Sequence, residues 1–492
     1  MHSSSDSLQD NVPSLIDATL DDLQRGLSQK HFTSVQLVQA YKARIAEVNS
    51  IFKAEKGARS MLHGLPFLLK DNIATLNRIE ATSGSTVLLG TRPSVEAGVV
   101  KRLREAGAVI LSTANLSEFA GFRHTNASTG WTSGSSTGSA TSVGLGLTLA
   151  GLGTETVSSI VSPAEKSCVV GFKPTHGTLP TYGIIPVSHR QDMVGTIGRT
   201  VKDVAQILGV LVESSRYREK PDYAASCDGT DLVGVRIGVV LHPGKKIDPA
   251  KLDSFHEALA LLKGAGAVII DGLQLAGVQE YEALSQRMKD IVLETDFKAS
   301  MDAYLLSLAK TPRRILTLQA LVRAITNDPS EDIPARNVDV MQRALGTSTD
   351  APDYTLMLQN EEYYSSSGGF EGTMDRHDCG VLIAPAGSLT LQTFASIGGN
   401  PVITVPMGIY PDGTKVEYNE TRGGLVLVAP GIRFSLFLYG RKHRDPRLLR
   451  VAHAFEQLSA ARKRARPYKL PESDLKDFIP ETKTQRLKRG ML

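Results

Sequence analysis

The chain has 492 residues, of which 41% are hydrophobic and 22% are charged. This composition allows a large buried core and excludes a chain whose main state is disordered. The net charge of +4 arises from 55 basic and 51 acidic residues. We interpret the basic runs at 462–466 and 486–489 as a solvated helix end and a tail, because no nucleic-acid-binding motif accompanies them. A nucleic-acid partner is therefore not expected.

The residue types that bind metals or form disulfides show no recognisable framework. The three cysteines, Cys168, Cys227 and Cys379, are widely spaced, and none belongs to a Cys-x-x-Cys pair. The histidines show no His-x-x-x-His or Glu-x-x-His spacing, and no phosphate-binding glycine loop occurs. The N-terminus lacks an apolar signal core, and no charge-free apolar run is long enough to cross a bilayer. We therefore expect no cofactor, no metal, no membrane partner and a cytoplasmic location.

The first 73 residues predict helices followed by one buried strand. Residues 1–14 are polar and are expected to form a flexible N-terminus. Apolar residues then recur at helical spacing over residues 20–27, and again over residues 33–45, where a Thr-Ser pair supplies the cap. The apolar run 65–69 has the pattern of a buried strand and ends at Lys70. By itself, a lysine in this place is more often a surface terminator than a catalyst.

The stretch from Ser133 to Asp203 carries most of the motifs. It opens with a loop of small residues at 133–140, which lets backbone approach backbone or a ligand closely. The apolar segment Val143 to Leu152 is interpreted as a helix, a second serine-bearing segment follows at 153–160, and residues 168–173 have the pattern of a short buried strand. Two serine-bearing loops, joined by a helix and backed by a strand, are therefore expected to meet in space.

Helix–glycine–strand units flank this stretch. Residues 99–111 predict a helix, a glycine cap and a strand, and residues 235–240 and 258–270 predict a further strand and a second such unit. This alternation predicts an α/β fold with a mainly parallel or mixed sheet. The chain is expected to continue with a helical covering region at about 278–360, strands at 379–386 and 399–408, a closing helix at 448–462 and a basic tail at 471–492.

Four blocks of this sequence resemble the amidase signature family, serine hydrolases that cut carboxamides with a Ser–cis-Ser–Lys triad. The family pattern has a Gly-Ser-Ser-Gly-Gly-Ser loop, a Gly-Thr-Asp-x-Gly-Gly-Ser-Ile segment, Gly-x-Lys-Pro-Thr and Gly-x-x-x-Arg-Thr-Val-x-Asp. This chain has, in the same order, Gly134-Ser135-Ser136-Thr137-Gly138-Ser139, Gly153 to Ile160, Gly171-Phe172-Lys173-Pro174-Thr175 and Gly195 to Asp203. The resemblance runs with gaps over residues 15–470, and it implies a single large α/β domain with a central mixed sheet flanked by helices.

The resemblance also implies a role for each member of the triad. Ser159 is expected to be the nucleophile, Ser135 the bridging serine, whose peptide bond is cis in the family, and Lys70 the base, in a matching Lys-Asp-Asn block. Burial of Lys70 would keep its amine neutral near pH 7. The oxyanion of the tetrahedral intermediate is expected to accept hydrogen bonds from the backbone N–H groups of Thr156, Val157, Ser158 and Ser159.

The sequence departs from the family pattern at this turn. Val157-Ser158 stand where the family has Gly-Gly or Asp-Gly, so Ser158 must adopt a conformation that suits glycine, and Val157 adds bulk beside the attacked carbonyl. Val161 stands where arginine is common, and the connections near residues 50–62 and 131–132 are shorter than in relatives. These departures leave a second interpretation open, in which the chain is a catalytically impaired family member with a binding role.

A third interpretation comes from another enzyme class. Gly134 to Gly138 formally matches the Gly-x-Ser-x-Gly elbow of α/β-hydrolases, with Ser136 as the nucleophile of an esterase. The elbow needs a strand immediately before it and an indispensable histidine, whereas residues 124–133 are polar and turn-like. The expected partner is a small-molecule amide, and a homodimer is left open. The family includes the amidase subunit of a transfer-RNA amidotransferase, but nothing here points to its partner chains.

Overall fold

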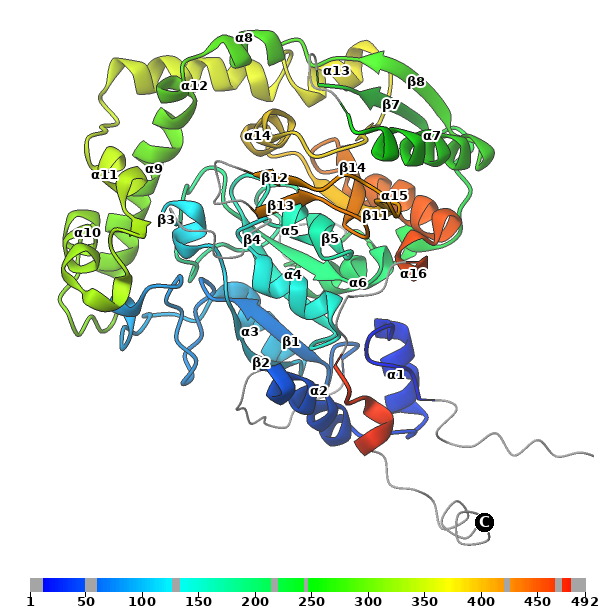
Figure 1. Cartoon of the computed structure of the whole chain (residues 1–492), viewed down its shortest axis with the longest axis horizontal. Helices are drawn as coiled ribbons and strands as arrows, with labels where there is room; N and C mark the ends of the chain where they lie inside the picture. The colour runs from blue at the N-terminus through cyan, green and yellow to red at the C-terminus, as the bar shows by residue number, and fades with distance from the viewer. Residues whose placement is uncertain are drawn as a thin grey trace, which may run out of the picture.

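The computed structural model describes residues 12–48, 60–125, 133–213, 220–242, 247–419, 425–464 and 471–478. Its centre is a ten-stranded sheet in the order β2-β1-β4-β6-β5-β11-β14-β10-β7-β8 (Figure 1). These strands are β1 Pro66–Lys70, β2 Val109–Ala114, β4 Ala150–Glu155, β5 Val170–Lys173, β6 Met193–Gly198, β7 Arg236–Val240, β8 Val268–Leu273, β10 Val381–Ala384, β11 Val402–Ile409 and β14 Arg433–Gly440. β1 is parallel to β2 and β4, and β7 is parallel to β8 and β10. From β4 to β10 in this order, each strand is antiparallel to the next one. The sheet is therefore mixed, as predicted.

Helices cover both faces of this sheet. One large hydrophobic cluster includes Val194 of β6, while a smaller cluster, built with α4 (Thr137–Gly144) and α5 (Val161–Lys166), includes Ile197 of the same strand. Val194 and Ile197 are three residues apart in one strand, so their side chains point to opposite faces. The helices of the large cluster are α1 Leu20–Ser28, α2 Ser34–Val48, α3 Gly98–Glu105, α6 Val201–Leu211, α7 Pro249–Gly264 and α15 Asp445–Ser459. The chain therefore forms one α/β domain, in agreement with the expected fold class.

The region expected to cover the sheet is helical. It contains α8 Val278–Ala283, α9 Gln286–Ser307, α10 Leu318–Asn327, α11 Asp339–Leu345 and α12 Pro352–Ser365. Figure 1 shows these helices as an arch that starts above α14 (Leu389–Ile397) and descends beside the short strand β3 (His124–Thr125). β3 pairs with β9 (Arg336–Asn337), which ties the lower end of the arch to the rest of the domain. α13 (Phe370–Arg376) leads from the arch back to the sheet.

The prediction of a helix from Val143 to Leu152 is wrong. α4 ends at Gly144, a turn follows in which Gly146 has a φ of +70°, and β4 begins at Ala150. All six residues of β4 are buried, and an apolar run buried on both faces cannot be told from a helix by periodicity. Within β4, position 153 has room only for glycine, because a Cβ there would lie 2.8 Å from Ser136 Oγ. The two serine-bearing loops are thus joined by a helix and a strand.

The two ends of the described chain contact each other. Asp474 accepts hydrogen bonds from the Ser14 hydroxyl at 2.7 Å and from the Leu15 N–H at 2.8 Å. Leu475, in the short helix η7 (Leu475–Phe478), is fully buried beside α2. The domain boundary at residue 470 stays a prediction, and residues 471–478 pack on the domain beyond it. Residues 1–11 and 479–492, and the short connections expected near 50–59 and 131–132, lie outside the described residues.

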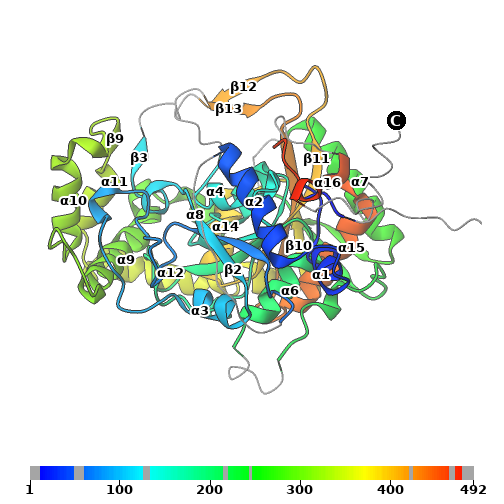
Figure 2. The same cartoon turned by 90° about the horizontal axis from the view of Figure 1, so that it is seen from below.

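Two further strands stand apart from the central sheet. β12 (Glu417–Asn419) pairs with β13 (Leu425–Val428), and Figure 2 shows the pair projecting from the body of the molecule. The last α-helix of the described chain, α16 (Ala461–Arg464), packs close to β11.

Candidate active site

Lys70 is the last residue of β1, and its side chain is fully buried. Its Nζ donates hydrogen bonds to Ser135 Oγ at 2.6 Å and to the carbonyl oxygen of Thr154 at 2.8 Å. Burial lowers the pKa of Lys70 to about 7, while the carboxylates of Asp192 and Glu155 act in the opposite direction. A large share of this amine is therefore neutral near pH 7, which is the form that can accept a proton.

Ser135 lies in the loop before α4, where its side chain is buried and the Gly134–Ser135 peptide bond is cis. Its carbonyl oxygen accepts a hydrogen bond from the Ser117 N–H at 3.1 Å. The next residue, Ser136, donates its N–H to the carbonyl oxygen of Ser159 at 3.0 Å. This backbone bond joins the two serine-bearing loops directly.

Ser159 is buried and follows a turn at the end of β4. In this turn Ser158 has a φ of +66°, so the residue adopts the left-handed conformation that the family usually fills with glycine. Among the described residues, the backbone N–H groups of Val157, Ser158 and Ser159 have no hydrogen-bond acceptor. Consecutive free N–H groups of this kind can bind a negatively charged oxygen.

Glu155 fixes the other side of the same turn. Its buried carboxylate accepts hydrogen bonds from the Ile160 N–H at 2.6 Å and from the Val161 N–H at 3.1 Å, where α5 begins. These bonds occupy the two N–H groups that follow Ser159, so the three groups before them remain open. The glutamate therefore sets the shape of the turn from within the core.

Asp192 lies beside the turn because of the pairing between β4 and β6. Glu155 is opposite Met193 in this antiparallel pair, so Thr156, one residue further along, meets Asp192. The Thr156 hydroxyl donates a hydrogen bond to Asp192 Oδ1 at 2.5 Å, and the Val187 N–H donates one to Oδ2 at 2.7 Å. Burial raises the pKa of Asp192 to about 6, against these hydrogen bonds and the charge of Lys70.

The predicted residues are not all joined by hydrogen bonds. Lys70 and Ser135 are linked directly, but among the described residues no hydrogen bond links the Ser135 and Ser159 hydroxyls. Ser136 is fully buried, and its hydroxyl donates to the carbonyl oxygen of Thr154 at 3.1 Å. A nucleophile elbow needs an exposed serine hydroxyl, so this arrangement disfavours the esterase interpretation.

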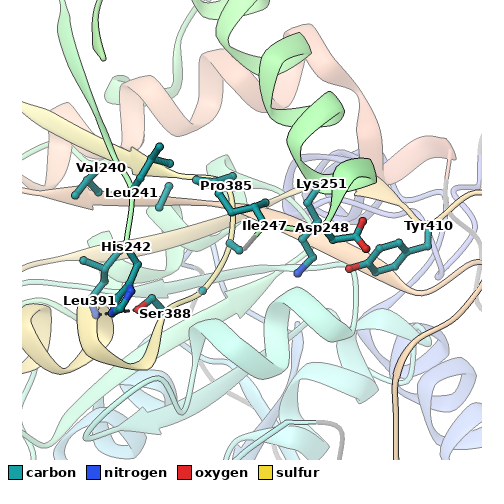
Figure 3. Close-up of a pocket in the computed structure, with 13 residues that line it drawn as sticks. Val240, Leu241, His242, Ile247, Asp248, Lys251, Pro385, Ser388, Leu391 and Tyr410 are labelled. Carbon is teal, nitrogen blue, oxygen red and sulfur yellow. Dashed lines mark hydrogen bonds between the residues drawn. The ribbon is translucent and has the colours of Figure 1, made fainter. Parts of the chain in front are cut away.

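A separate cavity of about 230 Å³ opens at the carboxyl ends of β7 and β10 (Figure 3). His242 and Ser388 lie at one end of it, and Asp248, Lys251 and Tyr410 lie at the other, with an apolar wall between them. The residues that line this cavity include neither Lys70 nor Ser135, Ser136 or Ser159. It is therefore a different place on the molecule from the buried lysine.

Within the part of the chain that the structure describes, no group of three or more His, Cys, Asp or Glu side chains is placed to hold a metal ion. No helix among these residues is long and apolar enough to cross a membrane.

A family model described as Amidase matches residues 28–396 of the chain. The chain belongs to the amidase signature family. A putative amidase of Arthroderma benhamiae is 34% identical over 95% of this chain and 90% of its own length. A probable amidase of Arabidopsis thaliana is 32% identical over 92% of this chain and 91% of its own length.

The amidase fold is also found in solved structures. The X-ray structure of a peptide amidase from Stenotrophomonas maltophilia superimposes with a TM-score of 0.78 and 27% identity, covering 93% of this chain and 99% of that one. The predicted family and fold class are therefore confirmed. Membership of this amidase family and the similarity to amidases support amide hydrolysis as the reaction class.

Two residues of the candidate site were not singled out from the sequence. Glu155 stands inside a family block, but at a position where the pattern has aspartate, and spacing does not reveal that it binds the next two N–H groups. Asp192 precedes the last family block and has no motif of its own. Its position opposite Thr156 depends on the register between β4 and β6, so a strand-pairing prediction would have been needed to find it.

Proposed function

We propose that the chain is an amidase that hydrolyses a linear carboxamide outside a peptide backbone through an acyl-enzyme intermediate. In this proposal Ser159 is the nucleophile, Ser135 carries the proton and Lys70 is the base. The observation that carries the proposal is the 2.6 Å contact between Lys70 Nζ and Ser135 Oγ in a fully buried position. The free N–H groups of the turn that ends at Ser159 support it.

The reaction begins with the transfer of two protons. Neutral Lys70 accepts the proton of the Ser135 hydroxyl while Ser135 takes the proton of Ser159, and the Ser159 oxygen attacks the amide carbon. The carbonyl oxygen gains the negative charge and accepts hydrogen bonds from N–H groups of the segment that the resemblance implies, Thr156, Val157, Ser158 and Ser159. Before the attack, the two serine hydroxyls must come within hydrogen-bond distance, which is a common adjustment when substrate binds.

The proton then returns along the same route. The Lys70 ammonium gives a proton to Ser135, and Ser135 gives its own to the leaving nitrogen, so that the amine departs and an ester remains on Ser159. Water attacks this ester with the same base and the same oxyanion donors, which releases the acid and restores the Ser159 hydroxyl. No cofactor takes part in these steps. The substrate in this proposal is a small amide, and the location is the reducing cytoplasm, which suits the three unpaired cysteines.

The turn geometry favours an active site over the impaired alternative. The substitution of serine for glycine at position 158 is accommodated by a left-handed backbone, and the N–H donors remain open. Lys70, Ser135 and Ser159 are all present and buried.

Labelling with a fluorophosphonate probe, which reacts with an activated serine, tests the proposal. We expect the wild-type protein to be labelled, Ser159→Ala and Lys70→Ala to lose the label, and Ser136→Ala to keep it. Retention of the label in Ser159→Ala together with its loss in Ser136→Ala would establish the esterase elbow instead. A folded wild-type protein that takes no label, with folding checked by its melting curve, would establish the impaired alternative.

A further inference from the structure

The segment Ser188–Asp192 connects the candidate active site to the covering helices. At its inner end, Asp192 accepts the hydrogen bond from the Thr156 hydroxyl at 2.5 Å. Thr156 begins the turn that ends at Ser159, and its side chain is buried. A hydrogen bond to an ionised carboxylate is about twice as strong as one between neutral groups, so Asp192 holds this end of the turn firmly.

The outer end of the same segment is anchored to α9 and α12. Asp296 of α9 accepts hydrogen bonds from the Ser188 hydroxyl at 2.5 Å and from Arg190 Nε at 3.0 Å. Arg190 Nη1 also donates to Glu361 of α12 at 3.1 Å. The Asp296 side chain is almost fully buried, which makes its bonds resistant to competition from water. The segment that carries Asp192 is thus fixed at both ends.

Asp192 is also one of two carboxylates whose charges act on the buried lysine. Glu155 does so from the end of β4, and Asp192 from the residue before β6. The carboxylate of Glu155 is engaged by the N–H groups of Ile160 and Val161. A negative charge near a lysine favours its ammonium form, so each carboxylate opposes the effect of burial.

We propose that Asp192 is a positioning residue for the amide hydrolysis proposed above, which holds the Ser159 turn through the hydroxyl of Thr156. This inference rests on the proposed function. The residue acts through two others, because one oxygen of its carboxylate binds Thr156 and its charge acts on the base. Ser188 and Arg190 keep the carboxylate in place by fixing the segment to α9 and α12.

The two effects can be separated by the rate of fluorophosphonate labelling, followed from pH 5 to pH 9 on the full chain. Asp192→Asn removes the charge and keeps an acceptor for Thr156, so the pH of half-maximal labelling rate falls by about one unit, since a single nearby charge shifts a pKa by about that much or more. Thr156→Val removes the hydroxyl and keeps the charge. Its labelling rate falls by about tenfold at pH 8 to 9, where Asp192 is ionised, because the variant loses one charge-assisted hydrogen bond. Thr156→Ser, which restores the hydroxyl, recovers the rate.

Specific results would overturn the inference. An unchanged midpoint in a folded Asp192→Asn variant would show that the charge of Asp192 does not act on Lys70. A wild-type rate in Thr156→Val would show that it does not hold the turn. If Asp192→Asn fails to fold, as judged by its melting curve, Asp192→Glu and the pair of Thr156 variants decide, and equal rates in Thr156→Val and Thr156→Ser overturn the inference.

Failure of the proposed function gives a different pattern. In that case the wild-type protein takes no label, or Ser159→Ala keeps it. When the wild type is labelled at Ser159 and Lys70→Ala is not, the proposed function stands, and the Asp192 and Thr156 variants then test the positioning role alone.

Discussion

Replacement of Glu155 by glutamine should destabilise the protein through the turn that presents Ser159. The Glu155 side chain is 1% exposed, and Oε2 accepts the N–H groups of Ile160 and Val161 at 2.6 and 3.1 Å. A hydrogen bond to a charged group contributes about 1.5–3 kcal/mol, against about 0.5–1.5 kcal/mol for a neutral one. Glutamine keeps an oxygen for both bonds, loses the charge and replaces the buried Oε1, which has no hydrogen-bond partner among the described residues, with an amide NH2. The free energy of unfolding should therefore fall by about 2–3 kcal/mol.

Chemical denaturation at pH 7.5 measures this loss as a lower midpoint with an unchanged slope. Glu165→Gln is the matched control, because Glu165 is a buried glutamate of α5, the helix that begins beside the N–H groups bound by Glu155. It pairs with Lys251 at 3.5 Å and with Lys166 at 3.8 Å, both longer than the bonds of Glu155. We expect the control to lose about 1 kcal/mol or less, since contacts at these distances are poorly formed hydrogen bonds. The reasoning is refuted if Glu155→Gln unfolds at the wild-type midpoint, or loses no more than the control.

Three other predictions follow from single groups. The labelling rate should rise about tenfold from pH 6 to pH 8 with a midpoint near pH 7, because burial lowers the pKa of Lys70 to about 7 and only the neutral amine accepts a proton; a flat profile would contradict this. Ser158→Gly should raise the free energy of unfolding by about 0.5–1 kcal/mol, because a left-handed serine costs about 1–2 kcal/mol and glycine returns part of this as chain entropy. Ser158→Ala should give no gain, and equal stability of the two variants would be inconsistent with backbone strain. Burial raises the pKa of Glu456 to about 8, above its unfolded value of 4.5, so the folded carboxyl contributes stability that is complete below pH 4.5 and lost as the pH rises to 8. The unfolding midpoint of Glu456→Gln should therefore rise relative to that of the wild type as the pH increases from 4.5 to 8.5. A difference between the two midpoints that does not vary with pH would argue against this assignment.

The sequence predicted those parts of the fold that local pattern decides. The apolar run that ends at Lys70 forms β1, and the helix, Gly107 and strand over residues 99–111 form α3 and β2. The first is a short apolar run that a charged residue ends, and the second has a helix with one buried face, followed by a glycine with a φ of +73°. The segment from Val143 to Leu152 was mispredicted, since a strand buried on both faces has no alternation to reveal it. Sheet order could not be predicted, because neighbours such as β5 and β11 come from distant parts of the chain.

The candidate site also contains residues that a local sequence pattern reveals and residues that it does not. Lys70, Ser135 and Ser159 could be singled out as candidates because each stands in a block that resembles the amidase pattern. Asp192 and its partner Thr156 are 36 residues apart, and their contact is created by the register of an antiparallel strand pair. The pKa of Lys70 likewise depends on burial by elements that no local pattern specifies.

The bond between Asp474 and the Ser14–Leu15 segment has a consequence for how the protein is made. These residues are 460 positions apart, and Leu475, beside Asp474, fills the core next to α2. During synthesis the N-terminal helices emerge long before Asp474 is translated, 460 positions later. This contact can form only after residue 474 has left the ribosome. Because residues 14 and 474 are neighbours in the folded protein, a circularly permuted gene that joins the two ends with a short linker and opens the chain elsewhere should still encode this fold.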